Sequence, residues 1–213
     1  MLYTKFFKRL FDIVLALIAA PFVALAVVIM APFIYFEDKG PIFYNGVRRG
    51  RNGKSFKMFK LRSMYVDSPD LKAADGSTFN SDKDPRVTKI GRFMRKTSID
   101  ELPQIFNILI GDMSFIGPRP TLAKTPYEQL PENRKRRLQV LPGVTGYTQA
   151  YYRNSITQDE KFKYDLYYVE NISFWMDVKI LFKTAMSVLR RENIYVSQGT
   201  APAESAKETV DTK

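Results

Sequence analysis

The pattern of apolar and polar positions divides the chain into one long apolar run and a remainder of shorter, mixed segments. Residues Ile13 to Phe36 contain no formally charged side chain over 24 positions. That length exceeds the point at which a membrane segment becomes the default interpretation. As one helix, the run would extend about 36 Å, enough to cross a hydrocarbon core of about 30 Å. The pattern therefore predicts that this part of the chain enters a bilayer.

Two features of the run argue against a simple crossing. Pro21 lies inside it, and a proline removes a helix hydrogen bond and clashes with the preceding turn. Basic residues flank both ends, so the positive-inside rule places both ends on the cytoplasmic side. These flanking residues are Lys5, Lys8 and Arg9 before the run, and Lys39, Arg48, Arg49, Arg51 and Lys54 after it.

We therefore favour a proline-kinked, re-entrant membrane helix over residues 1–38, with Asp12 near its mouth. Two alternatives stay open. One is a single-pass anchor, and the other is a cleaved signal peptide with Ala24-Leu25-Ala26 as its processing site. The apolar run continues well past this tripeptide, which is long for a signal peptide.

After the apolar run, the spacing becomes that of strands. Apolar and polar residues alternate from Phe56 to Arg62, and the preceding Asn52-Gly53 pair suits a tight turn. With Ile42-Phe43-Tyr44 as a first strand, this pattern predicts a small β-hairpin. The stretch from Tyr65 to Asp84 is rich in Asp, Ser, Gly and Lys, so we expect a surface loop with one short helix at most, or a cover for an active site.

Helical spacing dominates the rest of the chain. It predicts a helix over Lys89 to Lys96 and a second helix that ends at Gly111. The second helix has the apolar stripe Leu102, Ile105, Phe106, Leu109 and Ile110. Two more helices follow a turn-rich connection, and the last, from Asp177 to Arg191, would either lie on a membrane surface or pack on the core.

Together these elements predict an α+β fold, mostly helical and membrane-associated, with a small β-hairpin. We expect a catalytic domain with interfacial helices over residues 39–196. The final segment, 197–213, consists mainly of Ala, Ser, Thr, Glu and Lys and is predicted to be disordered.

Composition then narrows the chemistry. The 213 residues include no His and no Cys, and 33 Lys plus Arg against 22 Asp plus Glu give a net charge of +11. These absences exclude a Ser-His-Asp triad, a thiol nucleophile and an ordinary zinc site. The positive charge suits a polyanionic partner, which could be nucleic acid, anionic lipid or a phosphorylated substrate.

The strongest candidate site is the carboxylate pair Asp100-Glu101. A series of cations at helical spacing leads into it, namely Arg86, Lys89, Arg92, Arg95 and Lys96. Cations and carboxylates together suit phosphate chemistry, with a divalent metal held by a carboxylate. Spacing alone favours a simpler alternative, because Ser98-x-x-Glu101 also matches a helix capping box.

Two further basic features can also be interpreted either as a binding site or as ordinary structure. Arg119 lies between Pro118 and Pro120, so its backbone is rigid and its side chain could grip a phosphate or stack on a base. The same residues could simply form a rigid corner with a surface arginine. The cluster Arg134-Lys135-Arg136-Arg137 is more often a solvated or lipid-facing helix surface than a specific site.

The motifs in this order closely resemble bacterial monotopic phosphoglycosyl transferases, from about Lys5 to Val196. The matching segments are Lys60–Met64, Asp84–Arg92, Thr97–Gln104, Gly111–Pro120, Pro142–Gly146 and Tyr167–Asn171. Some positions depart from the family pattern. Ala20 precedes Pro21 where many relatives have Ser, Gly46 stands where Gln is frequent, and Tyr147 stands where Trp is frequent.

The resemblance implies the transfer of a sugar 1-phosphate from a UDP-sugar to undecaprenyl phosphate, with Mg²⁺ as cofactor. Asp100 would be the nucleophile of a ping-pong mechanism through a covalent phosphosugar-aspartyl intermediate, and would also contact the metal. Glu101 would position or deprotonate the second nucleophile or assist the metal. The implied phosphate or nucleotide contacts are Lys60, Arg62, Arg86, Arg95 and Arg119.

The resemblance also implies a setting for this activity. The protein would initiate surface glycan, exopolysaccharide or glycoprotein assembly as a minimal catalytic unit. It would sit in the bacterial inner membrane with its catalytic domain on the cytoplasmic face, among membrane lipids. Downstream glycosyltransferases are further expected partners, nucleic acid is not expected, and homodimer formation is left open.

Two rival functions remain at this point. The positive charge would also suit a membrane-tethered module that binds nucleic acid or anionic lipid, although no nucleic-acid-binding motif is present. Alternatively, water instead of the lipid could resolve the aspartyl intermediate, which would make the protein a nucleotide-sugar hydrolase.

Overall fold

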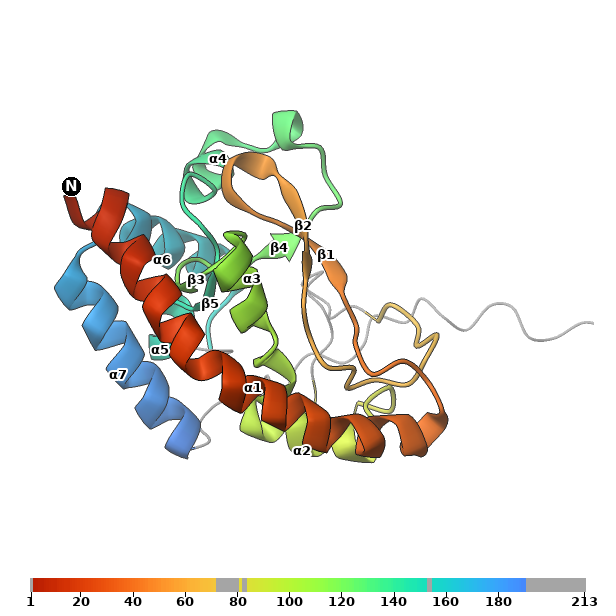
Figure 1. The fold of residues 1–213 in the computed structure, drawn as a ribbon. Helices are drawn as coiled ribbons and strands as arrows, with labels where there is room; N and C mark the ends of the chain where they lie inside the picture. Colours follow the sequence, from red (N-terminus) through yellow and green to blue (C-terminus); the bar gives the residue numbers. More distant parts are fainter. Residues whose placement is uncertain (1, 72–80, 82–83, 153–154, 191–213) are drawn as a thin grey trace, which may run out of the picture.

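The computed structural model describes residues 2–71, 81, 84–152 and 155–190, and these form an α+β fold in which helices predominate (Figure 1). The predicted α+β class is therefore confirmed. The predicted tail at 197–213, much of the loop predicted before Asp84 and the end of the last predicted helix lie outside the described residues.

The helices follow the sequence pattern closely. Thr88 caps the helix predicted at Lys89, since its hydroxyl accepts a hydrogen bond from the Gly91 amide at 2.9 Å. Gly111 ends the next helix with a φ of 98°, which glycine adopts readily. The last helix begins at Phe174, slightly earlier than predicted. The helices are α1 (Lys8–Asp38), α2 (Lys89–Thr97), α3 (Gln104–Ile110), α4 (Glu132–Arg137), α5 (Tyr147–Tyr151), α6 (Gln158–Glu170) and α7 (Phe174–Arg190), with a π-helical segment at Tyr3–Phe7 and 3₁₀ turns at Arg51–Gly53, Ile99–Glu101 and Tyr127–Gln129.

Two small sheets complete the described fold. The antiparallel sheet has the order β2-β1-β4, and the second sheet is the parallel pair β3-β5. The strands are β1 (Gly46–Arg49), β2 (Ser55–Met58), β3 (Ser114–Ile116), β4 (Thr121–Leu122) and β5 (Gly143–Thr145). The predicted hairpin is confirmed, because β1 pairs with β2 and Asn52 turns the chain between them with a φ of 53°.

The first strand of the hairpin was predicted at the wrong place. The regular strand begins at Gly46, and Ile42-Phe43-Tyr44 continues its register through an isolated bridge between Phe43 and Leu61. The Tyr44 amide donates to the Lys60 carbonyl at 2.9 Å, and the Arg62 amide donates to the Ile42 carbonyl at 2.8 Å. On the opposite edge of this segment, Asn107 of α3 binds the amide of Phe59 at 2.8 Å and the carbonyl of Lys57 at 2.9 Å.

Helix α1 runs along the rest of the fold and changes direction partway along its length (Figure 1). Both Pro21 and Pro32 lie inside the helix, and prolines are a common cause of such bends. Its inner face packs on two hydrophobic clusters. One includes Ala16 and Val23 with Phe56, Met58, Ile105, Ile108 and Met113, and the other combines Met30 and Ile34 with Leu61 and Met94.

Polar contacts fasten the N-terminal part of α1 to the domain. The buried carboxylate of Asp177 in α7 accepts hydrogen bonds from Tyr3 and Lys8, both at 2.6 Å. The buried carboxylate of Asp12 accepts from the Ser114 hydroxyl at 3.1 Å and the Phe115 amide at 3.0 Å. These contacts hold the beginning of α1 against α7 and β3.

The C-terminal end of α1 is fastened to the same domain. Both carboxylate oxygens of Asp38 bind the Arg62 guanidinium, at 2.5 and 2.6 Å. Glu37 accepts hydrogen bonds from the amides of Lys89 and Ile90, at 2.5 and 3.1 Å, and so caps the start of α2. Both ends of α1 thus meet one polar domain.

The outer face of α1 is apolar and uncovered in the described part of the chain. Phe22, Val28 and Phe36 are 70%, 69% and 67% exposed, and on the neighbouring helix α7 Trp175 and Phe182 are 71% and 69% exposed. Within that part of the chain, the helical stretch Tyr3–Asp38 alone is long and apolar enough to cross a membrane. Such a continuous apolar surface suits contact with lipid.

The pair of the buried Arg62 and the partly buried Asp38 provides a first prediction about stability. Replacing Arg62 with Ala leaves the Asp38 carboxylate without its cation, so the free energy of unfolding should fall by about 3–5 kcal/mol. Chemical denaturation of the detergent-solubilised protein measures this change. The control is Lys124→Ala, which breaks an exposed pair with Asp70 and should cost less than about 1 kcal/mol. Equal losses in the two variants would contradict the anchoring role of Arg62.

Candidate active site

Asp100 lies in a short turn between α2 and α3. Helix α2 ends at Ser98, which adopts a left-handed conformation with a φ of 58°, and a 3₁₀ turn follows at Ile99–Glu101. The Ser98 side chain makes no capping hydrogen bond, so the capping-box alternative is wrong. The Asp100 carbonyl accepts a hydrogen bond from the Leu61 amide at 2.9 Å. This contact ties the turn to the segment that follows β2.

Asn107 fixes the other side of the same segment. Its fully buried side chain holds the Lys57 carbonyl and the Phe59 amide. Lys60 therefore lies between two backbone anchors, one at Phe59 and one at Leu61. Because both neighbours are held, the Lys60 side chain is directed toward the Asp100 turn.

A cluster of four charged side chains results. The Lys60 ammonium lies 2.8 Å from Asp100 Oδ2 and 3.3 Å from Glu101 Oε1, and the Arg119 guanidinium lies 2.7 Å from the same Glu101 oxygen. The exposure of the side chains rises outward, from 2% for Asp100 to 20% for Glu101 and 51% for Arg119. The carboxylate pair is therefore approached from the side of Arg119.

The electrostatics of the cluster favour a charged Glu101. Partial burial raises the pKa of the Glu101 carboxyl, but the charges of Arg119 and Lys60 and their hydrogen bonds outweigh burial and hold this pKa well below its usual range. In turn, the negative charge of Glu101 raises the pKa of Arg119. Glu101 and Arg119 are thus held as ions.

A third cation at this site was missed by sequence reasoning. Burial lowers the pKa of Arg48 on β1, and the charges of Tyr44 and Glu101 oppose this effect while Arg119 adds to it. Arg48 is therefore close enough to interact with Glu101 and Arg119. Its sequence neighbours, Arg49 and Arg51, are also basic, so the sequence contains no signal that distinguishes Arg48.

The structure brings only some of the predicted phosphate-binding residues together. Lys60 and Arg119 contact the carboxylate pair. Arg62 is engaged with Asp38, as described above, and Arg86 forms a buried pair with Asp84, at 2.8 Å between Arg86 Nη2 and Asp84 Oδ2. Arg95 donates a hydrogen bond to the Ser63 hydroxyl at 2.9 Å. Arg62 and Arg86 thus support the scaffold around the site.

The carboxylates of Asp100 and Glu101 could serve as protein ligands of a magnesium ion. Asp100 Oδ2 is buried and forms an ion pair with Lys60 at 2.8 Å, but among the described residues it accepts no hydrogen bond of good geometry, so it could take a further ligand. The described residues contain no group of three or more carboxylate, His or Cys side chains that could hold a metal alone. Mg²⁺ commonly uses one or two carboxylates and completes its shell with substrate phosphates. Asp100 and Glu101 could hold the ion in that way.

Comparison with known proteins identifies the class. Residues 3–191 match the family model described as bacterial sugar transferase, so the chain belongs to this family. It is 40% identical over 203 residues to the undecaprenyl-phosphate galactose phosphotransferase of Salmonella typhimurium, which covers 90% of this chain and 42% of that protein.

Two other relatives match this chain with similar identity and cover a similar share of it. Identity is 38% over 195 residues to the UDP-glucose:undecaprenyl-phosphate glucose-1-phosphate transferase of Xanthomonas campestris, covering 88% of this chain and 40% of the relative. The uncharacterized sugar transferase EpsL of Bacillus subtilis is 40% identical over 190 residues, and here 88% of this chain and 89% of the relative are covered. The chain thus spans less than half of the first two relatives and most of the third.

The pair of Arg119 and Glu101 leads to a prediction about pH. In Arg119→Gln, the pKa of Glu101 should rise toward its ordinary value of 4.5, because an attractive charge is lost. Because the pKa of Glu101 is lowered in the folded protein, its negative charge stabilises the folded state at pH values above 4.5. This stabilisation is lost as the pH falls through the folded-state pKa of Glu101. Carbon NMR titration of the Glu101 carboxyl measures the shift. The variant Arg51→Gln, which changes an exposed arginine, should leave the titration of Glu101 unchanged. An unchanged midpoint in Arg119→Gln would refute the claim that Arg119 lowers the pKa of Glu101.

Proposed function

We propose that this protein transfers a sugar 1-phosphate from a UDP-sugar to undecaprenyl phosphate. The observation that supports this best is the buried Asp100 carboxylate beside Lys60, at the inner end of a cationic approach through Arg119. Membership of the bacterial sugar transferase family supports the same reaction. Relatives whose names give galactose, glucose and N-acetylgalactosamine phosphotransferases supply the class of substrate.

In the first step, a carboxylate oxygen of Asp100 attacks the phosphorus that bears the sugar. A new bond forms between the aspartyl oxygen and phosphorus, the bond from phosphorus to the UMP oxygen breaks, and UMP leaves with that electron pair. Lys60 would have to move from Asp100 to the incoming phosphate, which frees the carboxylate as the negative charge of the substrate arrives. Arg119 is the exposed member of the cluster and would meet the diphosphate first.

In the second step, an oxygen of undecaprenyl phosphate attacks the same phosphorus. The aspartyl-phosphate bond breaks, Asp100 is regenerated as a carboxylate, and undecaprenyl-diphosphate-sugar is released. The lipid phosphate already carries negative charge, so no strong base is required. This agrees with Glu101, because its lowered pKa makes it a weak base.

Glu101 is therefore better suited to holding cations in place by its negative charge than to accepting a proton. It holds Arg119 and Lys60 in place, and together with Asp100 it could bind Mg²⁺. When bound, the ion would neutralise phosphate charge during transfer.

We further propose that α1 is re-entrant, entering and leaving the membrane on the cytoplasmic side of the bacterial inner membrane. A helix that crosses a bilayer separates its two ends by the thickness of the membrane. Here the N-terminal part is held by Asp177 and the C-terminal end by Arg62, and both residues belong to the same polar domain. The exposed apolar face of α1 would then lie in one leaflet, close to the phosphate of a buried lipid substrate.

The reaction is tested by UMP release from UDP-glucose, UDP-galactose and UDP-N-acetylgalactosamine with Mg²⁺, in the presence and absence of undecaprenyl phosphate. With the correct donor, sustained UMP release should require the lipid. Asp100→Asn should reduce it by about a thousandfold or more, because the nucleophile is lost. Asp70→Asn changes an exposed aspartate in the same way and should retain activity.

Other outcomes of this experiment separate the rivals. Sustained release without the lipid would mean that water resolves the intermediate, as in a hydrolase. Salt-sensitive binding of nucleic acid or anionic vesicles without any UMP release would support a binding module instead. Full activity of Asp100→Asn would remove Asp100 from the role of nucleophile.

Topology gives an independent prediction. The chain contains no cysteine, so single cysteines at Lys5 and Arg51 can be labelled in intact cells with a reagent that does not cross the inner membrane. Both positions should remain unlabelled until the membrane is disrupted. Labelling of one position alone in intact cells would indicate a crossing helix and would exclude the re-entrant arrangement.

A further inference from the structure

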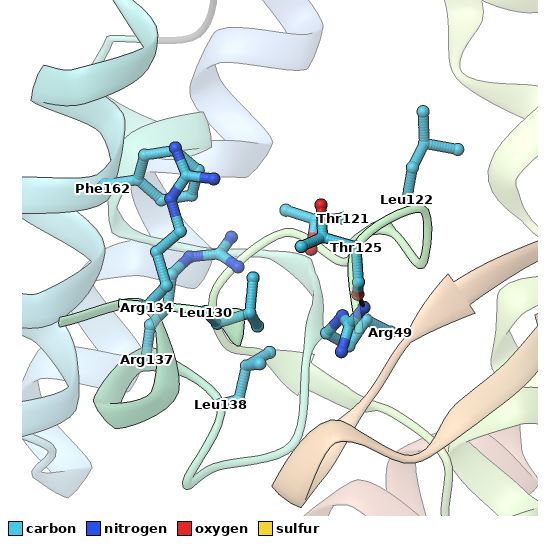
Figure 2. A pocket seen from close by; sticks show the side chains of 9 residues that line it. All are labelled: Arg49, Thr121, Leu122, Thr125, Leu130, Arg134, Arg137, Leu138 and Phe162. Atoms are coloured by element: carbon cyan, nitrogen blue, oxygen red, sulfur yellow. Dashed lines mark hydrogen bonds between the residues drawn. The ribbon is translucent and has the colours of Figure 1, made fainter. Parts of the chain in front are cut away.

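A second cationic cavity lies apart from the Asp100 cluster. The pocket has a volume of about 80 Å³ and lies between β1, the segment from β4 to α4, and α6 (Figure 2). Three arginines line it, Arg49, Arg134 and Arg137, together with the ring of Phe162 and the threonines 121 and 125. None of its lining residues is Lys60, Asp100, Glu101 or Arg119.

The charge of Arg49 is the unusual feature of this pocket. Arg49 is only 5% exposed, and its guanidinium donates a hydrogen bond to the Thr125 carbonyl. Among the described residues, no carboxylate forms an ion pair with it. A buried arginine is ordinarily paired with an anion, because an unbalanced buried charge is costly. The pocket thus contains a buried positive charge without a counter-charge from the described chain.

The other two arginines differ from each other. Arg137 is neutralised, since its Nε lies 2.7 Å from Asp165 in a buried pair. Arg134 lies 4.6 Å over the Phe162 ring and, in the part of the chain that the structure describes, forms no ion pair. Figure 2 shows Arg134 and Phe162 on one side of the pocket and Arg49 on the other. The described lining therefore presents two cations without a carboxylate partner, the buried Arg49 and the exposed Arg134, across a small space.

We propose that this pocket binds a soluble anion that bears phosphate, at a site separate from Asp100. Guanidinium groups are well matched to phosphate oxygens, and the threonine hydroxyls can donate further hydrogen bonds. The volume admits a phosphate or diphosphate group and leaves a larger ligand to project outward. A lipid headgroup is a less suitable source, because α4 lies on the opposite side of the fold from the C-terminal half of α1 (Figure 1).

The two sites are neighbours although they share no lining residue. Consecutive residues of a strand point to opposite faces, so β1 directs Arg48 and Arg49 to different sides. Arg137 also donates a hydrogen bond from Nη2 to the carbonyl of Arg119, whose side chain contacts Glu101. An anion in the pocket would therefore lie next to the backbone that positions Arg119.

Calorimetric titration with inorganic pyrophosphate tests the proposal on the full chain in neutral detergent. Arg119→Gln serves as the background, because it weakens anion binding at the Asp100 cluster and leaves the pocket lining intact. Pyrophosphate should still bind to this background in a 1:1 ratio. Adding Arg134→Gln, which changes an exposed pocket residue, should weaken this binding by about tenfold or more. Adding Arg136→Gln, which makes the same change on α4 outside the pocket, should alter it less than about twofold.

Three results would overturn the proposal. Arg119→Gln alone could abolish pyrophosphate binding, which would assign all anion binding to the Asp100 cluster. Arg134→Gln and Arg136→Gln could have equal effects, which would indicate unspecific attraction to a basic helix. Finally, phosphatidylglycerol vesicles could displace pyrophosphate where phosphatidylcholine vesicles do not, and the occupant would then be a lipid headgroup.

Discussion

The hydrogen bond from the Leu61 amide to the Asp100 carbonyl is the contact on which the candidate site depends. It joins the end of the hairpin to the turn between α2 and α3, two segments about 40 residues apart in sequence. Asn107 reinforces it from α3 by holding Lys57 and Phe59. These contacts use the edge of the segment that faces away from β1, where β2 has no neighbouring strand among the described residues. The free edge of the hairpin is therefore what holds Lys60 beside Asp100.

The segment from Met58 to Leu61 also connects the site to the apolar helix. On either side of Lys60, Met58 belongs to the hydrophobic cluster that contains Ala16 and Val23, and Leu61 belongs to the cluster that contains Met30 and Ile34. The distance between Asp100 and the outer face of α1 is thus set by close packing and does not depend on a flexible linker. For the proposed reaction between a water-soluble sugar nucleotide and a lipid phosphate, this fixed relation would bring both substrates to one carboxylate.

Local pattern predicted much of the fold but only part of the site. The spacing located α2, the end of α3 at Gly111 and the hairpin turn, because each depends on neighbouring residues. The first strand was placed too early, because Ile42-Phe43-Tyr44 pairs with the second half of the hairpin only through an isolated bridge, and apolar spacing does not distinguish such a bridge from a regular strand. The sequence also could not tell which cations lie beside Asp100 and Glu101. Arg62 and Arg86 are cations like Lys60 and Arg119, but they pair with other carboxylates, those of Asp38 and Asp84. The role proposed for Asp100 came from the family resemblance, since the spacing alone favoured a capping box.

The central claim is that Asp100 attacks the sugar-bearing phosphate and forms a covalent intermediate. Mass spectrometry of the protein after brief incubation with the active UDP-sugar and Mg²⁺, without undecaprenyl phosphate, tests it most directly. The account predicts an added mass of one sugar phosphate on the peptide that contains Asp100, which disappears when the lipid is added. A lipid product formed without any such adduct, or an adduct on another residue, would contradict it.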